Sequence, residues 1–67
     1  MAMIKVIEVL AQSEKSWEDA ARVAVETAGQ SVKNIRSVYI KEMEAKVDDN
    51  RITQFRINAK ISFELER

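Results

Sequence analysis

The stretch RSVYIKEMEAKV (residues 36–47) decides the fold, because it reads as one long β-strand of β-branched, aromatic and charged residues without a break. A polar turn, VDDNR (47–51), leads into a second long strand, RITQFRINAKISFELE (51–66), in which apolar and polar residues alternate strictly. The chain has 67 residues, so it has room for little else to pack against this ribbon. The fold must therefore explain what covers the rest of it.

The upstream half predicts one strand and one helix. MIKVIEVL (3–10) is β-branched and carries apolar residues on both faces of a strand. WEDAARVAVETAGQSV (17–32) has apolar residues at helical spacing, and Ser16 followed by Asp19 has the spacing of a capping box. Gly29 weakens the last turn, and we expect the helix to end at Lys33–Asn34.

The predicted fold class is α+β with the chain order β-α-β-β. The crossover makes the first two strands parallel, and the hairpin makes the third antiparallel to the second. We therefore predict a three-stranded antiparallel sheet in the order 1-3-2, which partly wraps one helix. Residues 1–67 are expected to form a single domain.

A two-residue turn at Asp49–Asn50 would place Val38 opposite Ile61 and Ile40 opposite Ala59, against the helix. A three-residue turn is the alternative, and it would shift the register by one residue. With the two-residue turn, the sheet face away from the helix is half polar, and it is either solvated or meets another subunit or a ligand. This face collects Ser37, Tyr39, Lys41, Met43, Ala45, Arg56, Asn58, Lys60 and Ser62.

Composition excludes several classes of function. Eleven basic residues balance eleven acidic ones, so the basic excess of a nucleic-acid-binding protein is absent. The chain has no Cys and no His, which removes disulfides, the usual zinc and copper sites, and catalytic triads or thiol nucleophiles. We therefore expect no enzyme, and we expect a cytoplasmic protein because no membrane-spanning or signal-peptide run is present. Oligomerisation is the remaining aid to the stability of so small a chain.

Two features of the sequence could be mistaken for parts of a ligand site. Asp48, Asp49 and Asn50 offer hard oxygen ligands, but the glycine and spacing of an EF-hand loop are missing, so a solvated turn is predicted there and no metal site. Trp17 lies at the helix start, where we expect an anchor for the core or for an interface, not a ligand-stacking ring.

Four segments together resemble the dodecin family: KVIEV (5–9), SWEDAARVAVETA (16–28), Asn34–Ile35 and RITQFRINAKISFELE (51–66). The resemblance implies a small β-α-β-β subunit, twelve of which form a hollow shell. It also implies that flavin, FMN or riboflavin, binds between subunits on an aromatic ring, for storage and not for catalysis.

The flavin site that the resemblance implies departs from the family pattern at two positions. Ser37 stands where flavin-binding dodecins have a stacking Trp, and Arg56 stands where they have a Gln. Tyr39 could supply the stacking surface instead, and Arg56 could hold a ring carbonyl or a phosphate. Ser37 and Met43 would line this pocket, and Arg56 could equally pair with Glu42 or Glu44 of a neighbouring subunit.

The expected function is therefore a homododecamer that sequesters flavin at its subunit interfaces. The alternative is a shell of the same kind that has lost flavin. Such a shell would bind another small ligand, a coenzyme A-like metabolite or a metal cation, or would serve as a structural assembly.

Overall fold

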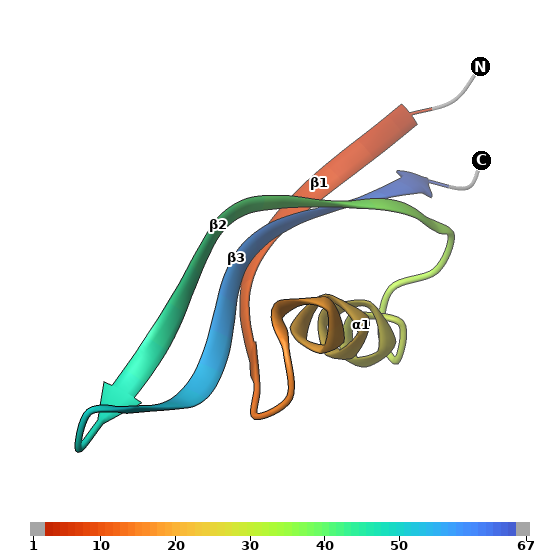
Figure 1. The fold of residues 1–67 in the computed structure, drawn as a ribbon. Coiled ribbons are helices and arrows are strands. Elements are labelled where there is room, and N and C mark those ends of the chain that lie inside the picture. The colour runs from red at the N-terminus through yellow and green to blue at the C-terminus, as the bar shows by residue number, and fades with distance from the viewer. Residues whose placement is uncertain (1–2, 66–67) are drawn as a thin grey trace.

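The computed structural model describes residues 3–65. It contains three strands and one helix, and in chain order the helix follows the first strand (Figure 1). The elements are β1 (Met3–Ser13), α1 (Trp17–Ala28), β2 (Ile35–Asp48) and β3 (Arg51–Leu65). The predicted α+β class and β-α-β-β order are therefore confirmed. The predicted end of the last strand at residue 66 lies outside the described residues.

The sheet has the predicted order, with β3 between β1 and β2 and both pairings antiparallel. β1 pairs with β3 without a register shift, from Met3 opposite Leu65 to Ser13 opposite Phe55. Because β3 has a neighbour on each side, it supplies the deepest residues of the sheet. Ile57, Ala59 and Ile61 are all buried.

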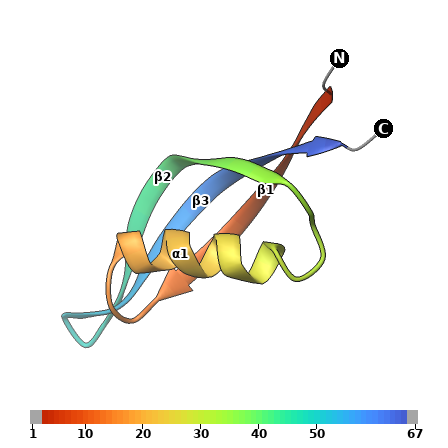
Figure 2. The same cartoon turned by 90° about the vertical axis from the view of Figure 1, so that its right-hand side faces the viewer.

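Helix α1 lies across one side of the sheet (Figure 2). Its start is capped as predicted: the Ser16 hydroxyl accepts a hydrogen bond from the Asp19 backbone N–H at 2.9 Å. Ala20 and Ala24 are the buried residues of the helix, and Ala20 packs against Ile57 and Ala59. Small side chains on this side let the helix approach the sheet closely.

The helix ends at Ala28, which is earlier than the predicted end at Lys33–Asn34. Gly29 follows it, and a glycine gains little from helical conformation because its backbone loses the most freedom. Turn-like hydrogen bonds continue to Val32, whose N–H donates to the Ala28 carbonyl at 2.9 Å. Asn34 then takes a left-handed conformation with φ of 64° and redirects the chain into β2.

The hairpin turn is the predicted two-residue turn. Asp48 pairs with Arg51, and Asp49 and Asn50 both have positive φ, at 53° and 61°. Positive φ at both central residues is typical of the type I′ turn, whose twist matches that of the strands. The predicted pairing of Val38 with Ile61 is also confirmed.

The prediction for the distal half of β2 was wrong, because the register shifts by one residue between Ile40 and Glu42. Lys41 is the extra residue of a β-bulge, and a second irregularity near the turn restores the original register. The shift places Met43 opposite Ile57 and Ala45 opposite Phe55, on the helix side of the sheet. Met43 and Ala45 were predicted to share a face with Tyr39, and they lie on the opposite face instead.

Two carboxylates take the place of Met43 and Ala45 on the side of the sheet away from the helix. Glu42 pairs with Asn58 and Glu44 pairs with Arg56. The physical reason for the shift is the apolar pattern of the strand. Val38 and Ile40 are followed by Met43 and Ala45, so the apolar residues stay on the helix side only if one residue is looped out.

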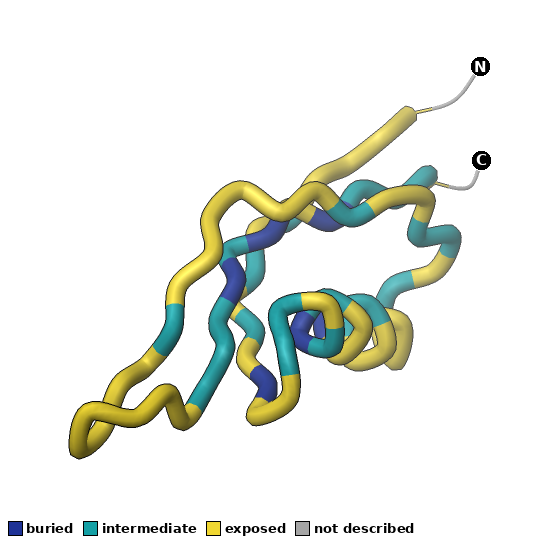
Figure 3. The backbone as a smooth tube through the Cα atoms, viewed as in Figure 1, coloured by how far each residue is buried: buried dark blue, intermediate teal, exposed yellow. Residues whose placement is uncertain are grey.

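The hairpin extends well beyond the helix. The molecule measures 51 × 20 × 13 Å along its principal axes, whereas the twelve residues of α1 span about 18 Å. Every residue from Lys46 to Thr53 is exposed, as the distal part of the tube shows (Figure 3). The described chain therefore leaves the far end of its ribbon without cover.

Two isoleucines of β3 test this placement of the core. Ile57 is 1% exposed, so Ile57→Val should lower the free energy of unfolding by about 0.5–1.5 kcal/mol through the lost methylene. Ile52 is 55% exposed, so Ile52→Val should change it by less than about 0.5 kcal/mol. Urea denaturation of both variants at one protein concentration measures the difference. Equal losses would contradict the core described above.

Candidate functional site

One side of the sheet is covered by no element of residues 3–65, because α1 lies against the other side (Figure 1). We call this side the open face. Its side chains alternate with buried Ile57, Ala59 and Ile61 of β3, and their cross-strand partners lie beside them. The open face comprises Val6, Glu8, Leu10 and Gln12 of β1, Arg56, Asn58, Lys60 and Ser62 of β3, and Ser37, Tyr39, Glu42 and Glu44 of β2.

Ser37 and Tyr39 occupy one end of the open face. The Ser37 hydroxyl is hydrogen-bonded to the hydroxyl of Ser62, its partner on β3. Tyr39 pairs with Lys60, and 63% of Tyr39 is exposed. This end therefore offers one flat aromatic ring on an otherwise polar surface.

Arg56 occupies the other end, and its guanidinium is already engaged. Its Nε donates to Gln12 Oε1 at 2.9 Å, and its Nη1 lies 3.7 Å from Glu44 Oε1. The alternative expected for Arg56 was an ion pair with Glu42 or Glu44 of a neighbouring subunit, and the pair with Glu44 forms within one chain. Both side chains are substantially exposed, so the ion pair contributes little to stability, about 0–1 kcal/mol.

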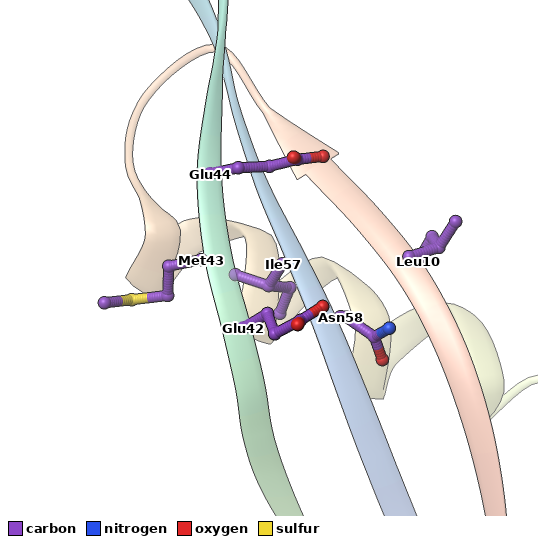
Figure 4. A pocket seen from close by; sticks show the side chains of 6 residues that line it. All are labelled: Leu10, Glu42, Met43, Glu44, Ile57 and Asn58. Carbon is purple, nitrogen blue, oxygen red and sulfur yellow. The ribbon is translucent and has the colours of Figure 1, made fainter.

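A shallow hollow of about 380 Å³ lies between these two ends. Figure 4 shows Glu42 and Glu44 reaching from β2 across β3, whereas Met43 points away from them. Asn58 forms the floor between Glu42 and Leu10, its partners on the two neighbouring strands. The Asn58 Oδ1 atom is buried and accepts no hydrogen bond from the described residues. An unsatisfied buried acceptor is costly, so this amide oxygen is a polar group of the hollow that still lacks a partner.

The predicted site residues do not all lie together in the structure. Ser37 and Tyr39 lie side by side on the open face, two residues apart on β2. Tyr39 lies opposite Lys60, four residues along β3 from Arg56, which is a separation of about 13 Å. Met43 lies on the other face of the sheet. A ring stacked on Tyr39 would therefore reach Arg56 of its own chain only through a long substituent.

The residues that sequence reasoning missed are Glu42 and Glu44 as neighbours of Asn58 on one face. The missing information was the bulge at Lys41. Its signal was present in the sequence, because the apolar positions of β2 change phase between Ile40 and Met43. Lys41 itself faces as predicted, since its Nζ lies 3.7 Å from Glu8 Oε2 of the open face.

The carboxylates of residues 3–65, Glu42 and Glu44 included, do not assemble a metal site within one chain. Among residues 3–65, no group of three or more Asp, Glu, His or Cys side chains is placed to hold a metal ion. At the hairpin tip, Asp48 Oδ2 accepts a hydrogen bond from Thr53 Oγ1 at 3.1 Å and lies 3.9 Å from Lys46 Nζ. The described part of the chain also contains no helix that is long and apolar enough to cross a membrane.

Comparison with known proteins agrees with the fold described above. The dodecin family model matches residues 3–66. The calcium dodecin of Mycobacterium tuberculosis is 37% identical over 65 residues, which cover 97% of this chain and 92% of that protein.

Two solved structures are similar over nearly their whole length. Dodecin from Streptomyces coelicolor superposes with a TM-score of 0.94 at 23% identity, covering 98% of this chain and 94% of that chain. The crystal structure of calcium dodecin from Mycobacterium tuberculosis, described as calcium chelating and with a novel calcium-binding site, has a TM-score of 0.83 at 37% identity. It covers 96% of this chain and 91% of that chain.

Proposed function

Because the chain belongs to the dodecin family, we propose that it is a subunit of a homododecameric storage protein that holds a small ligand between subunits. The open face carries this proposal. It presents charged, polar and aromatic groups over three strands, and no element of residues 3–65 covers it. A binding role also fits the absence of His and Cys, because the open face lacks the usual nucleophile and base pairs.

The small core supports the assembly. Among the described residues, Ile57 and Ile61 are the large side chains that are fully buried. Many large apolar side chains are exposed instead, and they include Leu10 at 82%, Met43 at 60% and Val47 at 58%. So much exposed apolar surface on so small a domain is typical of proteins that associate. Copies of the same chain would cover the distal ribbon and the open face.

A divalent cation is the ligand that the geometry of the open face supports best, and calcium is its first candidate. Glu42 and Glu44 extend over the same strand, beside the unpaired Asn58 Oδ1, and oxygen atoms of these types are the ligands that Ca²⁺ prefers (Figure 4). The 37%-identical relative is named a calcium dodecin. Ca²⁺ takes about six to eight oxygens, so carboxylates of a second subunit or waters would complete the shell.

Flavin, either FMN or riboflavin, is the second candidate, favoured by the exposed Tyr39 ring. The ring could stack on the isoalloxazine, with Ser37 beside it and Arg56 of a neighbour, or of the same chain through the phosphate, holding the other end. Two observations weaken this candidate. The family's stacking position is Ser37, whose hydroxyl bonds to Ser62, and Glu44 already neutralises Arg56. Met43 would reach such a flavin only from another subunit.

The assembly is tested by the mass in solution. Light scattering during size-exclusion chromatography should give about twelve times the 7.7 kDa of one chain, because shells of this family are closed. A monomer would overturn the proposal. The same run with FMN, monitored by absorbance, shows whether flavin elutes with the shell.

The cation is tested by removing the two carboxylate charges. Calcium titration calorimetry should show binding to the unaltered protein, and Glu42→Gln with Glu44→Gln should weaken it by about 10- to 100-fold or more, since even changes behind the ligands have that effect. Glu26→Gln, an exposed helix residue, is the matched control and should bind normally. An unchanged affinity in the double variant would remove Glu42 and Glu44 from the site.

The flavin candidate is tested at Tyr39. If flavin binds, Tyr39→Ala should weaken FMN binding by about 1–3 kcal/mol, the scale of aromatic–base stacking. Tyr39→Phe keeps the ring and should retain the affinity. Flavin fluorescence titration measures both, and equal binding by all three proteins would place the stacking surface elsewhere.

A further inference from the structure

Trp17 makes a contact that links the helix start to the open face. Its indole Nε1–H donates a hydrogen bond of 2.8 Å to the backbone carbonyl of Glu44, 27 residues away in the chain. We propose that Trp17 is a positioning residue for the ligand: it holds the distal half of β2 in place, so that Glu42 and Glu44 face the hollow on the open face. The ligand part of this inference rests on the proposed function.

The distal half of β2 has few other restraints. β2 is an edge strand, so one of its sides has no neighbouring strand in the sheet. Its register is interrupted by the bulge at Lys41, and from Glu42 to Asp48 every residue except Ala45 is exposed. A two-stranded ribbon with this little burial is weak by itself. A hydrogen bond from the helix to this half of the strand therefore adds a tertiary restraint to its pairing with β3.

The same indole also contacts the other strand of the ribbon. Its ring meets the Phe55 ring edge to face, with centroids 4.9 Å apart and planes at 78°. Phe55 lies opposite Ala45, the small residue that follows Glu44. Trp17 thus bonds to β2 through its N–H and packs against β3 through its ring, just beyond the bulge.

Trp17 is itself held in place by the core and by the capped start of the helix. It packs against the core cluster of Ala20, Ile57 and Ala59. It directly follows the cap residue Ser16. The same first turn is tied to the end of β1 by Asp19, whose carboxylate accepts a hydrogen bond from the buried Ser13 hydroxyl at 2.6 Å.

The consequence for the open face follows from the position of the bond. The carbonyl that Trp17 holds and the carboxylate that lies near Arg56 belong to the same residue, Glu44. Glu42 lies two residues away on the same face. A shift of the backbone at Glu44 therefore moves both carboxylates relative to Asn58.

The test is Trp17→Phe, which keeps an aromatic ring against Phe55 and removes the N–H donor. Native-state hydrogen exchange of residues 42–47 should become faster by about fivefold, the equilibrium equivalent of one ordinary hydrogen bond. Calcium affinity, measured by calorimetry, should fall by about the same factor. Both measurements use the assembled protein, after its mass has been checked.

Val38→Ala is the matched control. Val38 packs against the same core cluster but lies before the bulge, so this change should lower overall stability without a selective effect on residues 42–47. Unchanged exchange of residues 42–47 in Trp17→Phe would overturn the inference, as would an equal effect of Val38→Ala. If the unaltered protein binds no calcium, the proposed ligand fails, and the exchange rates still decide whether Trp17 anchors the ribbon.

Discussion

The close approach of α1 to β3 is the interaction on which the rest of the structure depends. Ala20 and Ala24 of the helix lie over Ile57, Ala59 and Ile61, and these residues form the buried core. Alanines permit this approach, but they bury little apolar area, so the core stays small for a chain of 67 residues. The helix is also much shorter than the strands that it covers. One well-packed side therefore leaves an open face and a free ribbon, which are the two surfaces available for assembly and binding.

Most of the fold could be predicted because its signals are local. The alternation of β3, the helical spacing after Ser16 and the turn residues Asp49–Asn50 each specify one element, and together they leave one reasonable topology. The helix end was predicted too late because the apolar Val32 continues the helical spacing beyond Gly29. Gly29 keeps a helical backbone and donates to the Val25 carbonyl, and the chain tightens into i→i−3 bonds directly after it, where a glycine makes helix less favourable.

The candidate site could be predicted only in part. Arg56 was assigned to the correct face because β3 alternates strictly, and Ser37 and Tyr39 were assigned correctly because the two register shifts between them and the turn cancel. Met43 was assigned to the wrong face, because the looped-out residue reverses the side chains from Glu42 to Lys46, up to the second irregularity. Tyr39 lies opposite Lys60, which is four residues from Arg56. The resulting separation of about 13 Å along the strand also follows from the register and needs no side-chain detail. Pairing within one chain does not specify what covers the open face.

The bulge at Lys41 also changes the chemistry of the open face. A regular strand would have placed Lys41 opposite Asn58 and Met43 opposite Arg56, with Ala45 on the same face, and would have given a flank with no carboxylate of β2. The bulge replaces these side chains with Glu42 and Glu44. Two carboxylates repel an anionic phosphate and attract a cation, and one of them neutralises the arginine that a phosphate would need. The same looped-out residue is therefore the structural basis of the proposal that this face takes a divalent cation in place of flavin, while the sheet beneath it keeps the dodecin fold.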